Sequence, residues 1–147
     1  MNNPTPPRFV VLYADDDRDD ISLVEEAFSA TTDNIMLVTA CDGIDALAYL
    51  RGLTDDDPIP CLIILDVNMP RLNGKETLHH IRTMERFRNV PVVLFTTSSM
   101  PVDRNFAEKY GAGFISKPLD TGQMKRIAHQ FLEHCADDVK SGLRIKV

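Results

Sequence analysis

The sequence predicts an α/β fold in which one five-stranded parallel sheet is covered by helices on both faces. Two observations lead to this class. Short apolar runs alternate five times with segments of helical periodicity. Several of these runs are apolar at every position, and strands with two apolar faces belong to parallel sheets that are buried on both sides. A chain of 147 residues has the usual length of one domain, so we expect a single doubly wound domain.

Each predicted strand is a short apolar run that ends at a polar residue or at a change of pattern. The five strands are expected over Phe9–Ala14, Ile35–Ala40, Cys61–Leu65, Val90–Phe95 and Phe114–Ser116. Right-handed crossovers between such strands favour the flavodoxin-like order 2-1-3-4-5. In that order, ligands bind beyond the carboxyl ends of the first and third strands, where the order reverses.

Each predicted helix repeats apolar residues at a spacing of three to four. The five helices are expected around Ile21–Phe28 and over Ile44–Leu50, Lys75–Met84, Asp103–Tyr110 and Met124–Cys135. Gly52 and Gly111 are plausible stops for the second and fourth helices. Strands and helices therefore alternate through most of the chain, as a doubly wound sheet requires.

The two ends of the chain are expected to lie outside the domain, which spans residues 8–136. Residues 1–7 are polar and rich in proline, which predicts a disordered leader. Residues 137–147 are polar and are expected to fray as a C-terminal tail. No apolar run approaches the ~20 residues that span a bilayer, and no basic region precedes an apolar stretch at the start of the chain. We therefore expect a cytoplasmic protein without membrane insertion.

Composition narrows the classes of function. The chain has 16 Lys and Arg against 22 Asp and Glu, a formal charge of −6. This excess of negative charge argues against direct binding of nucleic acid. Cys41, Cys61 and Cys135 are odd in number and form no CxxC pair. Neither a disulfide framework nor a zinc site is expected from them, and reduced thiols fit a cytosolic protein.

Ionisable and hydroxyl side chains stand at the carboxyl ends of four predicted strands. Asp15 and Asp16 follow the first strand, Asp66 the third, Thr96 the fourth and Lys117 the fifth. Three carboxylates this close cannot all stay ionised without a cation, and Mg²⁺ (or Mn²⁺) takes carboxylates, water and phosphate oxygens. A carboxylate beside such a cation, a lysine and a hydroxyl can attack phosphorus. The pattern therefore predicts phosphoryl transfer.

In this order and spacing, the motifs resemble the receiver domain of two-component response regulators, over about residues 9–134. They are the Asp15-Asp16 pair, LDVNMPRLNG around Asp66, Thr96, and Lys117 with the proline that follows it; Asp66 precedes Thr96 by 30 residues and Lys117 by 51. The resemblance implies a single-domain, CheY-like fold. The acidic connection before the third strand and the C-terminal tail resemble the receivers associated with phytochrome-type kinases.

The resemblance implies a role for each matching residue at the acidic end of the sheet. Asp66 would be the phospho-acceptor. Asp16 would bind the metal directly, with Asp15 nearby or acting through water. Asn68, two residues after the acceptor, would offer its backbone carbonyl to the metal.

On the other side of the site, Lys117 would contact the phosphoryl group, and Pro118 would follow a cis bond, against a base rate of only ~5% for bonds before proline. Thr96 and Phe114 match the switch pair, in which the hydroxyl moves toward the phosphoryl group and the aromatic ring turns inward. Phe114 stands where tyrosine is frequent, so a hydrogen bond from a ring hydroxyl is absent here.

The implied function is that of a stand-alone receiver, not of an enzyme beyond its own phosphorylation and dephosphorylation. A sensor histidine kinase or phosphotransfer protein would supply the phosphoryl group. The change would spread to the face made by the fourth helix, fifth strand and fifth helix and alter binding of a downstream effector protein or of a second copy in a homodimer. Residues 137–147 are too few for a DNA-binding output domain.

Two other functions stay open. An aspartate-nucleophile phosphatase shares the nucleophile and the metal but needs an aspartate as general acid at the position of Asn68. A phosphorylation-independent adaptor is the second, although the complete site argues against it.

Several further polar residues are expected to have structural rather than catalytic roles. Asp17, Asp19 and Asp20 are expected to cap the first helix and to interact with its dipole. His79 and His80 are expected at the surface of the third helix, because no carboxylate network surrounds them.

Overall fold

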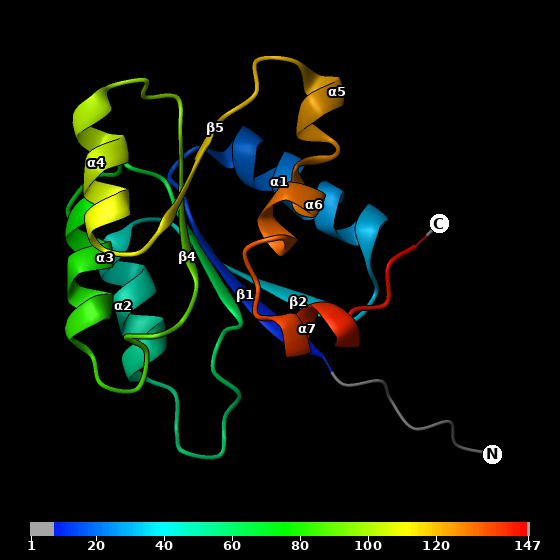
Figure 1. Cartoon of the computed structure of the whole chain (residues 1–147), viewed down its shortest axis with the longest axis horizontal. Coiled ribbons are helices and arrows are strands. Elements are labelled where there is room, and N and C mark those ends of the chain that lie inside the picture. The colour runs from blue at the N-terminus through cyan, green and yellow to red at the C-terminus, as the bar shows by residue number, and fades with distance from the viewer. Residues whose placement is uncertain (1–7, 147) are drawn as a thin grey trace.

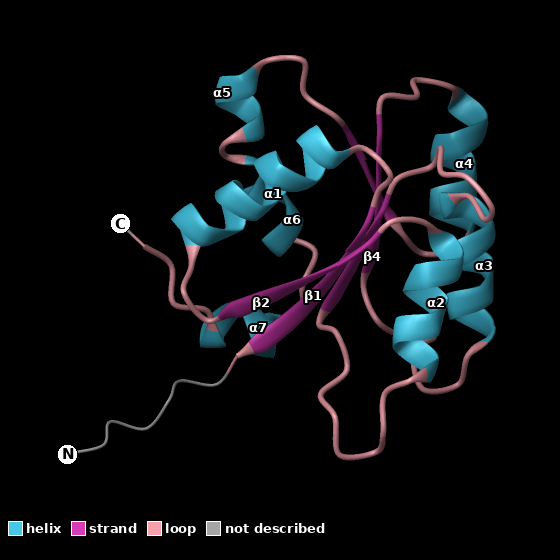
Figure 2. Cartoon of the chain, turned by 180° about the vertical axis from the view of Figure 1, so that it is seen from behind, coloured by secondary structure: helices cyan, strands magenta, loops and turns pink. Residues whose placement is uncertain are grey.

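The computed structural model describes residues 8–146 and contains the expected five-stranded parallel sheet in the order β2-β1-β3-β4-β5 (Figure 1, Figure 2). The strands are β1 (Phe9–Ala14), β2 (Ile35–Ala40), β3 (Leu62–Leu65), β4 (Val92–Thr96) and β5 (Gly113–Ser116). The predicted order is confirmed, and the strand ends differ from expectation by at most two residues. The leader expected over residues 1–7 lies outside the described residues.

Helices cover both faces of the sheet (Figure 2). One face is covered by α2 (Gly43–Arg51), α3 (Gly74–Thr83) and α4 (Pro101–Lys109). The other is covered by α1 (Arg18–Thr31), α5 (Thr121–Met124) and α6 (Ile127–Leu132). No helix in the described part of the chain is both long and apolar enough to cross a membrane.

Alternation along the strands creates two apolar layers. In β1, Val11 and Tyr13 face α1 and α6, whereas Leu12 and Ala14 face the opposite layer. All four are fully buried, which is why the sequence of this strand is apolar on both faces. A strand with this pattern is stable only where helices cover both sides, so the two layers hold the sheet in place for the site at its end.

The register of the central strands positions the site. Ala14 of β1 pairs with Leu65 of β3, and the backbone N–H of Asp66 donates to the Ala14 carbonyl at 3.0 Å. The residues directly after the two strands, Asp15 and Asp66, therefore lie side by side. At the other side of the sheet, the Lys117 N–H donates to the Thr96 carbonyl at 2.8 Å. The polar residues that follow the strands thus share one edge of the sheet.

The last predicted helix is divided in two. Between α5 and α6 the backbone bonds tighten to three-residue spacing, with Arg126 N–H donating to the Gln123 carbonyl and His129 N–H to the Arg126 carbonyl. Met124 and Phe131, on the two halves, are nevertheless both buried in the same apolar layer. The apolar spacing that predicted one helix is therefore kept across the break.

The C-terminal segment does not fray as expected. Residues Asp137–Gly142 form α7, and Ile145 pairs with Thr32 in an isolated antiparallel bridge. The buried Asn34 side chain holds the segment: its Nδ2 donates to the Gly142 carbonyl at 2.9 Å, and its Oδ1 accepts from Arg144 N–H at 3.1 Å. The expectation was wrong because the anchor is a polar side chain, which an apolar pattern does not indicate.

The cis bond expected before Pro118 is also wrong for this structure, since every peptide bond in residues 8–146 is trans. The trans form is favoured before proline by about 0.5–1 kcal/mol, so a cis bond requires a specific local constraint. Lys117 reaches the acidic edge of the sheet from a trans bond.

Candidate functional site

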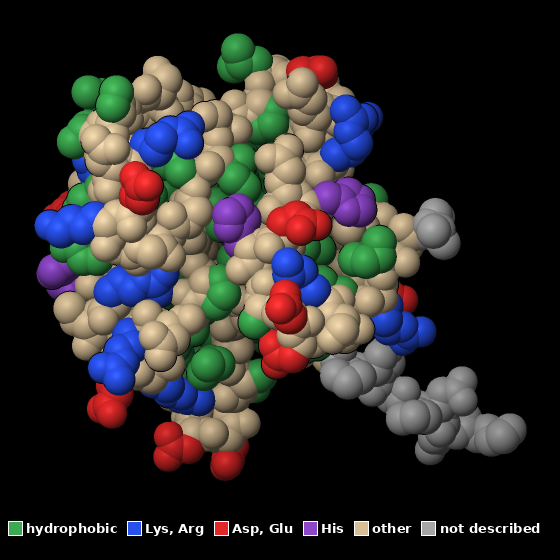
Figure 3. Space-filling view, viewed as in Figure 1, with side chains coloured by type: hydrophobic (Ala, Val, Ile, Leu, Met, Phe, Trp, Pro, Cys, Tyr) green, Lys and Arg blue, Asp and Glu red, His purple; other side chains and the backbone are tan. Residues whose placement is uncertain are grey.

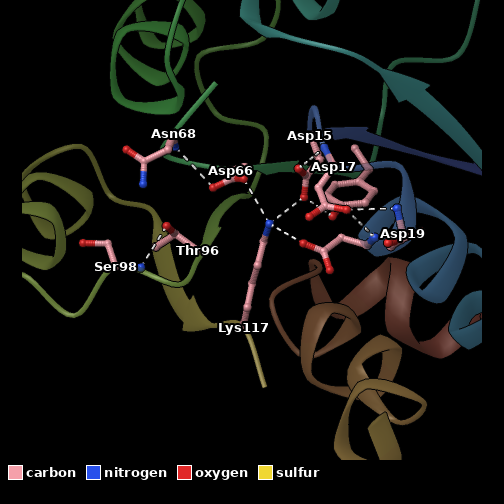
Figure 4. Close-up of polar contacts among 10 residues, drawn as sticks. Asp15, Asp17, Asp19, Asp66, Asn68, Thr96, Ser98 and Lys117 are labelled. Atoms are coloured by element: carbon pink, nitrogen blue, oxygen red, sulfur yellow. Dashed lines mark hydrogen bonds and ion pairs between the residues drawn. The ribbon is translucent and has the colours of Figure 1, made fainter. Parts of the chain in front are cut away.

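Three carboxylates converge where β1 and β3 end. Asp15, Asp16 and Asp66 each offer an oxygen within 4.8 Å of the other two. Asp15 is fully buried and Asp66 is 6% exposed, while Asp16 is exposed. Figure 4 shows Asp15 and Asp66 on either side of the Lys117 ammonium group. The sequence analysis predicted this convergence from the strand order.

Lys117 neutralises part of this charge. Its ammonium nitrogen lies 2.8 Å from Asp15 Oδ2, 3.0 Å from Asp66 Oδ2 and 2.7 Å from Asp20 Oδ2. The side chain is only 7% exposed. Desolvation lowers the pKa of Lys117, but its hydrogen bonds to Asp15 and Asp20 and the charge of Asp66 outweigh that effect and raise the pKa above its usual range. Lys117 is therefore a charged ammonium group at any physiological pH.

Asp66 is buried in a position that disfavours its charge. Burial raises its pKa to about 6, although the charge of Lys117 and its hydrogen bond lower it. The Asn68 N–H also donates to Asp66 Oδ1, at 3.2 Å. At neutral pH the group is still mostly ionised, and it is held at the rim of the sheet where a reagent can approach. These are the properties of a usable carboxylate nucleophile.

Asp15 has both of its oxygens occupied by the protein. Its Oδ2 accepts from Lys117 and, at 2.5 Å, from the hydroxyl of Tyr13, and its Oδ1 accepts from Asp17 N–H at 2.9 Å. Burial, followed by the charge of Asp15, raises the pKa of Tyr13 above its usual range, so the phenol is a neutral donor. Asp15 is therefore the most constrained of the three carboxylates.

Sequence reasoning missed the contributions of Tyr13 and Asp20. Asp17 caps α1 as expected, accepting from Asp19 N–H at 2.9 Å and Asp20 N–H at 3.2 Å. Asp20, however, also pairs with Lys117. A signal was available, because Asp20 lies four residues before the buried Val24 and so shares the inward face of the helix.

The loop between β3 and α3 packs against the backbone of Asp66. Gly74 approaches the backbone so closely that a Cβ there would lie 2.1 Å from the Asp66 carbonyl oxygen. Arg71 has a φ of 67°, in the left-handed region, and its Nε donates to Asp42 Oδ2 at 2.6 Å. Asn73 closes the loop with a capping box at the start of α3. Asn68 thus lies in a tightly fixed loop, next to the acceptor.

Thr96 begins a second polar link. It is fully buried, and its hydroxyl oxygen accepts from Ser98 N–H at 3.1 Å. The Ser98 hydroxyl donates to Asp103 Oδ2, and the Lys75 ammonium lies 2.8 Å from Asp103 Oδ1. The hydrogen bond from Lys75, followed by that from Ser98, lowers the pKa of Asp103. Asp103 was not expected in the site, and together with Ser98 it connects the end of β4 to α3.

The other half of the expected switch pair, Phe114, is half-buried on β5. The guanidinium group of Arg104 from α4 lies 4.7 Å from the centre of its ring. The ring also packs against the apolar layer under α2, α3 and α4. Phe114 therefore stands between the core and the α4 surface.

Two histidines considered in the sequence lie outside the site. His79 and His80 are exposed on α3, and His79 Nδ1 is 3.1 Å from the Tyr110 hydroxyl. Neither belongs to the acidic cluster. The surface positions expected for them are confirmed.

The face drawn in Figure 3 carries lysine and arginine side chains interspersed with acidic ones.

Comparison with known proteins identifies this arrangement. A family model described as the response regulator receiver domain matches residues 11–129. The chain is similar in sequence to the response regulator Rcp1 of Synechocystis sp., with 35% identity over 100 residues that cover 67% of this chain and 68% of that protein.

Solved structures of two such proteins are similar along most of the chain. The phosphorylated cyanobacterial phytochrome response regulator RcpA matches with a TM-score of 0.80 and 27% identity, covering 95% of this chain and 99% of that one. The Mn²⁺-bound form of Rcp1 matches with a TM-score of 0.76 and 26% identity, covering 85% and 92%.

Proposed function

Because the chain belongs to the response regulator receiver family, we propose that it is a phosphorylation switch of two-component signalling whose acceptor is Asp66. One observation carries the proposal. The Asp66 carboxylate lies beside an acidic pair and a buried lysine, with Lys117 Nζ at 3.0 Å and Asp15 and Asp16 within 4.8 Å. Negative charge is thus concentrated around a carboxylate nucleophile, and the lysine and a bound cation would neutralise charge on an incoming phosphoryl group.

The donor set fits Mg²⁺, with Mn²⁺ as a substitute. Hard cations of this kind take carboxylate and carbonyl oxygens and keep several waters. We assign direct binding to Asp16, Asp66 and the backbone carbonyl of Asn68. Asp15 acts through water, because both of its oxygens already accept hydrogen bonds from the protein. A bound cation supplies the charge that neutralises the carboxylates and the oxygens of the incoming phosphoryl group.

The transfer needs no general base, since Asp66 is already ionised. One of its oxygens attacks the phosphorus of a phosphohistidine on the partner. The new O–P bond forms as the N–P bond breaks, and the electron pair of the N–P bond stays on the imidazole nitrogen. Lys117 donates to an equatorial phosphoryl oxygen, and the Thr96 hydroxyl moves to donate to another.

The polar link at the end of β4 carries the change outward. When the Thr96 hydroxyl turns toward the phosphoryl group, its hydrogen bond with the Ser98 N–H changes. The Ser98 backbone then shifts, and with it the hydrogen bond from the Ser98 hydroxyl to Asp103. Asp103 belongs to α4 and is paired with Lys75 of α3. Rearrangement of this link, together with movement of Phe114, biases the surface formed by α4, β5 and the helices that follow β5 between two states.

The readout is contact with another protein. Leu119 is fully exposed two residues after Lys117, and Met100 and Val102 are 61% and 55% exposed at the start of α4. Both segments flank the carboxyl end of the sheet (Figure 1). Exposed large apolar side chains around a polar site are typical of partner surfaces. We infer a sensor histidine kinase or phosphotransfer protein as the phosphoryl donor, in the cytoplasm, and an effector protein or a second copy as the output.

The rival functions have less support. A phosphatase of the aspartate-nucleophile type requires a general acid two residues after the nucleophile, and the amide of Asn68 cannot protonate a leaving group. A phosphorylation-independent adaptor would have no use for the pairing of Asp66 with a buried lysine.

The test is the intact mass of the purified protein after incubation with acetyl phosphate, with and without Mg²⁺. We expect one phosphoryl adduct that requires Mg²⁺ and is missing in Asp66→Asn. The matched control is Asp103→Asn, which removes another buried carboxylate outside the cluster and should still form the adduct. An adduct that persists in Asp66→Asn, or none in a folded protein given acetyl phosphate and Mg²⁺, contradicts the proposal.

A further inference from the structure

Lys117 contacts one carboxylate that is not part of the acidic cluster. Asp20 belongs to the first turn of α1, and its Oδ2 lies 2.7 Å from Lys117 Nζ, the shortest of the three ion pairs that Lys117 makes. Its side chain is 21% exposed, so it lies at the edge of the site rather than inside it. The cluster that offers converging oxygens contains Asp15, Asp16 and Asp66 but not Asp20.

The local structure fixes Asp20 in this position. Asp17 is the N-cap of α1, so Asp20 is the third residue of the helix, and its backbone N–H donates to Asp17 Oδ1. Asp20 lies one turn before Val24, which is buried against the sheet. The helix therefore presents this carboxylate to the sheet edge, and the positive end of the helix dipole favours a negative charge there.

The number of donors on Lys117 gives Asp20 a distinct role. An ammonium group has three N–H donors, and here three carboxylates take them. A divalent cation would compete with Lys117 for Asp66, and phosphorylation converts the Asp66 carboxylate into an acyl phosphate whose negative charge lies on the phosphoryl oxygens. Asp15 stays committed to the Tyr13 hydroxyl and the Asp17 N–H. Asp20 is thus the partner of Lys117 that lies outside the cluster occupied by the cation and the phosphoryl group.

From this geometry we propose that Asp20 is a positioning residue, which holds the Lys117 ammonium beside Asp66 while the cluster is occupied by a cation and a phosphoryl group. The inference rests on the proposed function, because it assigns Asp20 a part in the same site. With Asp20 in place, Lys117 has a partner outside the cluster and competes less with the cation for Asp15 and Asp66. Without it, Lys117 shifts onto those two carboxylates and opposes cation binding.

The test is the affinity for Mn²⁺ alone, measured by electron paramagnetic resonance without a phosphoryl donor. We expect Asp20→Asn to weaken Mn²⁺ binding about fivefold, a coupling of ordinary size for neighbours in one charge network. Asp19→Asn is the matched control, because it removes one charge from the same helical turn at a side chain that makes no ion pair among the described residues. It should weaken binding less than twofold, and Asp20→Glu should recover part of the loss.

A double-mutant cycle then shows whether Asp20 acts through the lysine. In a Lys117→Met background, Asp20→Asn should have no larger effect than Asp19→Asn, because the ammonium group that it positions is gone. A fivefold loss in both backgrounds overturns the proposal, since Asp20 would then act on the cation only as a nearby charge. Equal affinities of Asp20→Asn and Asp19→Asn in the wild-type background overturn it as well. If the Asn variant does not fold, Asp20→Ala serves in the same cycle.

The outcomes separate this inference from the proposed function. Coupling between Asp20 and Lys117 in Mn²⁺ affinity, together with no phosphoryl adduct, supports the inference and contradicts phosphorylation of Asp66. A phosphoryl adduct without coupling between Asp20 and Lys117 supports phosphorylation of Asp66 and contradicts the inference. A wild-type chain that binds no Mn²⁺ contradicts both.

Discussion

Replacing Asp66 with asparagine should stabilise the metal-free protein. The side chain is 6% exposed, and burial raises its pKa from 3.8 to about 6 even though Lys117 Nζ lies 3.0 Å away. A rise of this size corresponds to about 3 kcal/mol in favour of the neutral form. Asparagine keeps the shape and removes the charge. Because Asp66 shares Lys117 with two other carboxylates, we expect a net gain of about 1–3 kcal/mol in the free energy of unfolding at pH 7.5.

The gain should depend on pH in one direction. Because the pKa of Asp66 is higher in the folded state than in the unfolded chain, the folded wild type binds more protons between about pH 4 and 6. Its stability therefore falls, relative to the variant, as pH rises through this window. The difference between the two should be small below about pH 4, where Asp66 is protonated in both states, and should level off above about pH 7.

Urea unfolding followed by circular dichroism, in buffer with a metal chelator, measures the effect. The control is Asp103→Asn, another buried carboxylate, whose pKa is lowered by Lys75 and Ser98. It should lose about 1–2 kcal/mol at pH 7.5, and the loss should stay nearly constant down to about pH 5 and shrink only below about pH 4, because the lowered pKa of Asp103 keeps its carboxylate ionised in the folded state until then. If Asp66→Asn destabilises the protein as Asp103→Asn does, or if its gain is the same at every pH, the reasoning is refuted. Saturating Mg²⁺ should narrow the gap by stabilising the wild type more.

Three other substitutions test separate parts of the structure. Gly74→Ala should cost about 3 kcal/mol in urea unfolding, because the new Cβ would lie 2.1 Å from the Asp66 carbonyl oxygen; a neutral result would mean that the loop is free to shift. Asn34→Ala should cost about 2 kcal/mol and speed amide hydrogen exchange of the C-terminal segment, since it removes both hydrogen bonds to that segment; unchanged exchange would show that the segment is held elsewhere. Tyr13→Phe should cost about 1–2 kcal/mol in urea unfolding, because the buried Asp15 carboxylate loses a hydrogen-bond donor. Equal stability of the variant and the wild type would mean that water replaces the hydroxyl.

The sheet and the acidic cluster could be predicted from sequence because both follow from local patterns. Uniformly apolar runs indicate strands buried on both faces, and the rule for parallel sheets places the residues after them at one edge. The pairing of Ala14 with Leu65 brings the next residues, Asp15 and Asp66, together. Such a prediction needs only the strand order and the first polar residue after each strand.

The missed features share a different origin, which is polar contact over long distances in the chain. Asp20 meets a lysine 97 residues away, and Asn34 holds a carbonyl 108 residues away. Neither pairing leaves a period in the sequence, because a polar side chain at a helix start or in a loop has many satisfactory partners, including water. The tail was expected to fray for this reason, since its anchor lies in another polar segment. The cis bond was wrong because it came from the resemblance alone, and nothing in the local sequence favours it over the trans form.

The distribution of charge explains how a compact domain can respond to a single phosphoryl group. The two apolar layers consist of buried, closely packed side chains. Within the described residues, every buried side-chain nitrogen or oxygen has a hydrogen-bond partner. The carboxyl edge of the sheet is different. Asp66 is ionised at neutral pH although burial raises its pKa, and its partner Lys117 forms ion pairs with two other carboxylates as well.

A change of charge at Asp66 should therefore act on the polar links before it acts on the packing of Phe114. One such link runs from Thr96 at the end of the neighbouring strand through Ser98 to Asp103 and ends on α3 and α4. Because these hydrogen bonds break and form at lower cost than a core is repacked, the signal should leave the site along this link, with the apolar layers acting as the rigid frame.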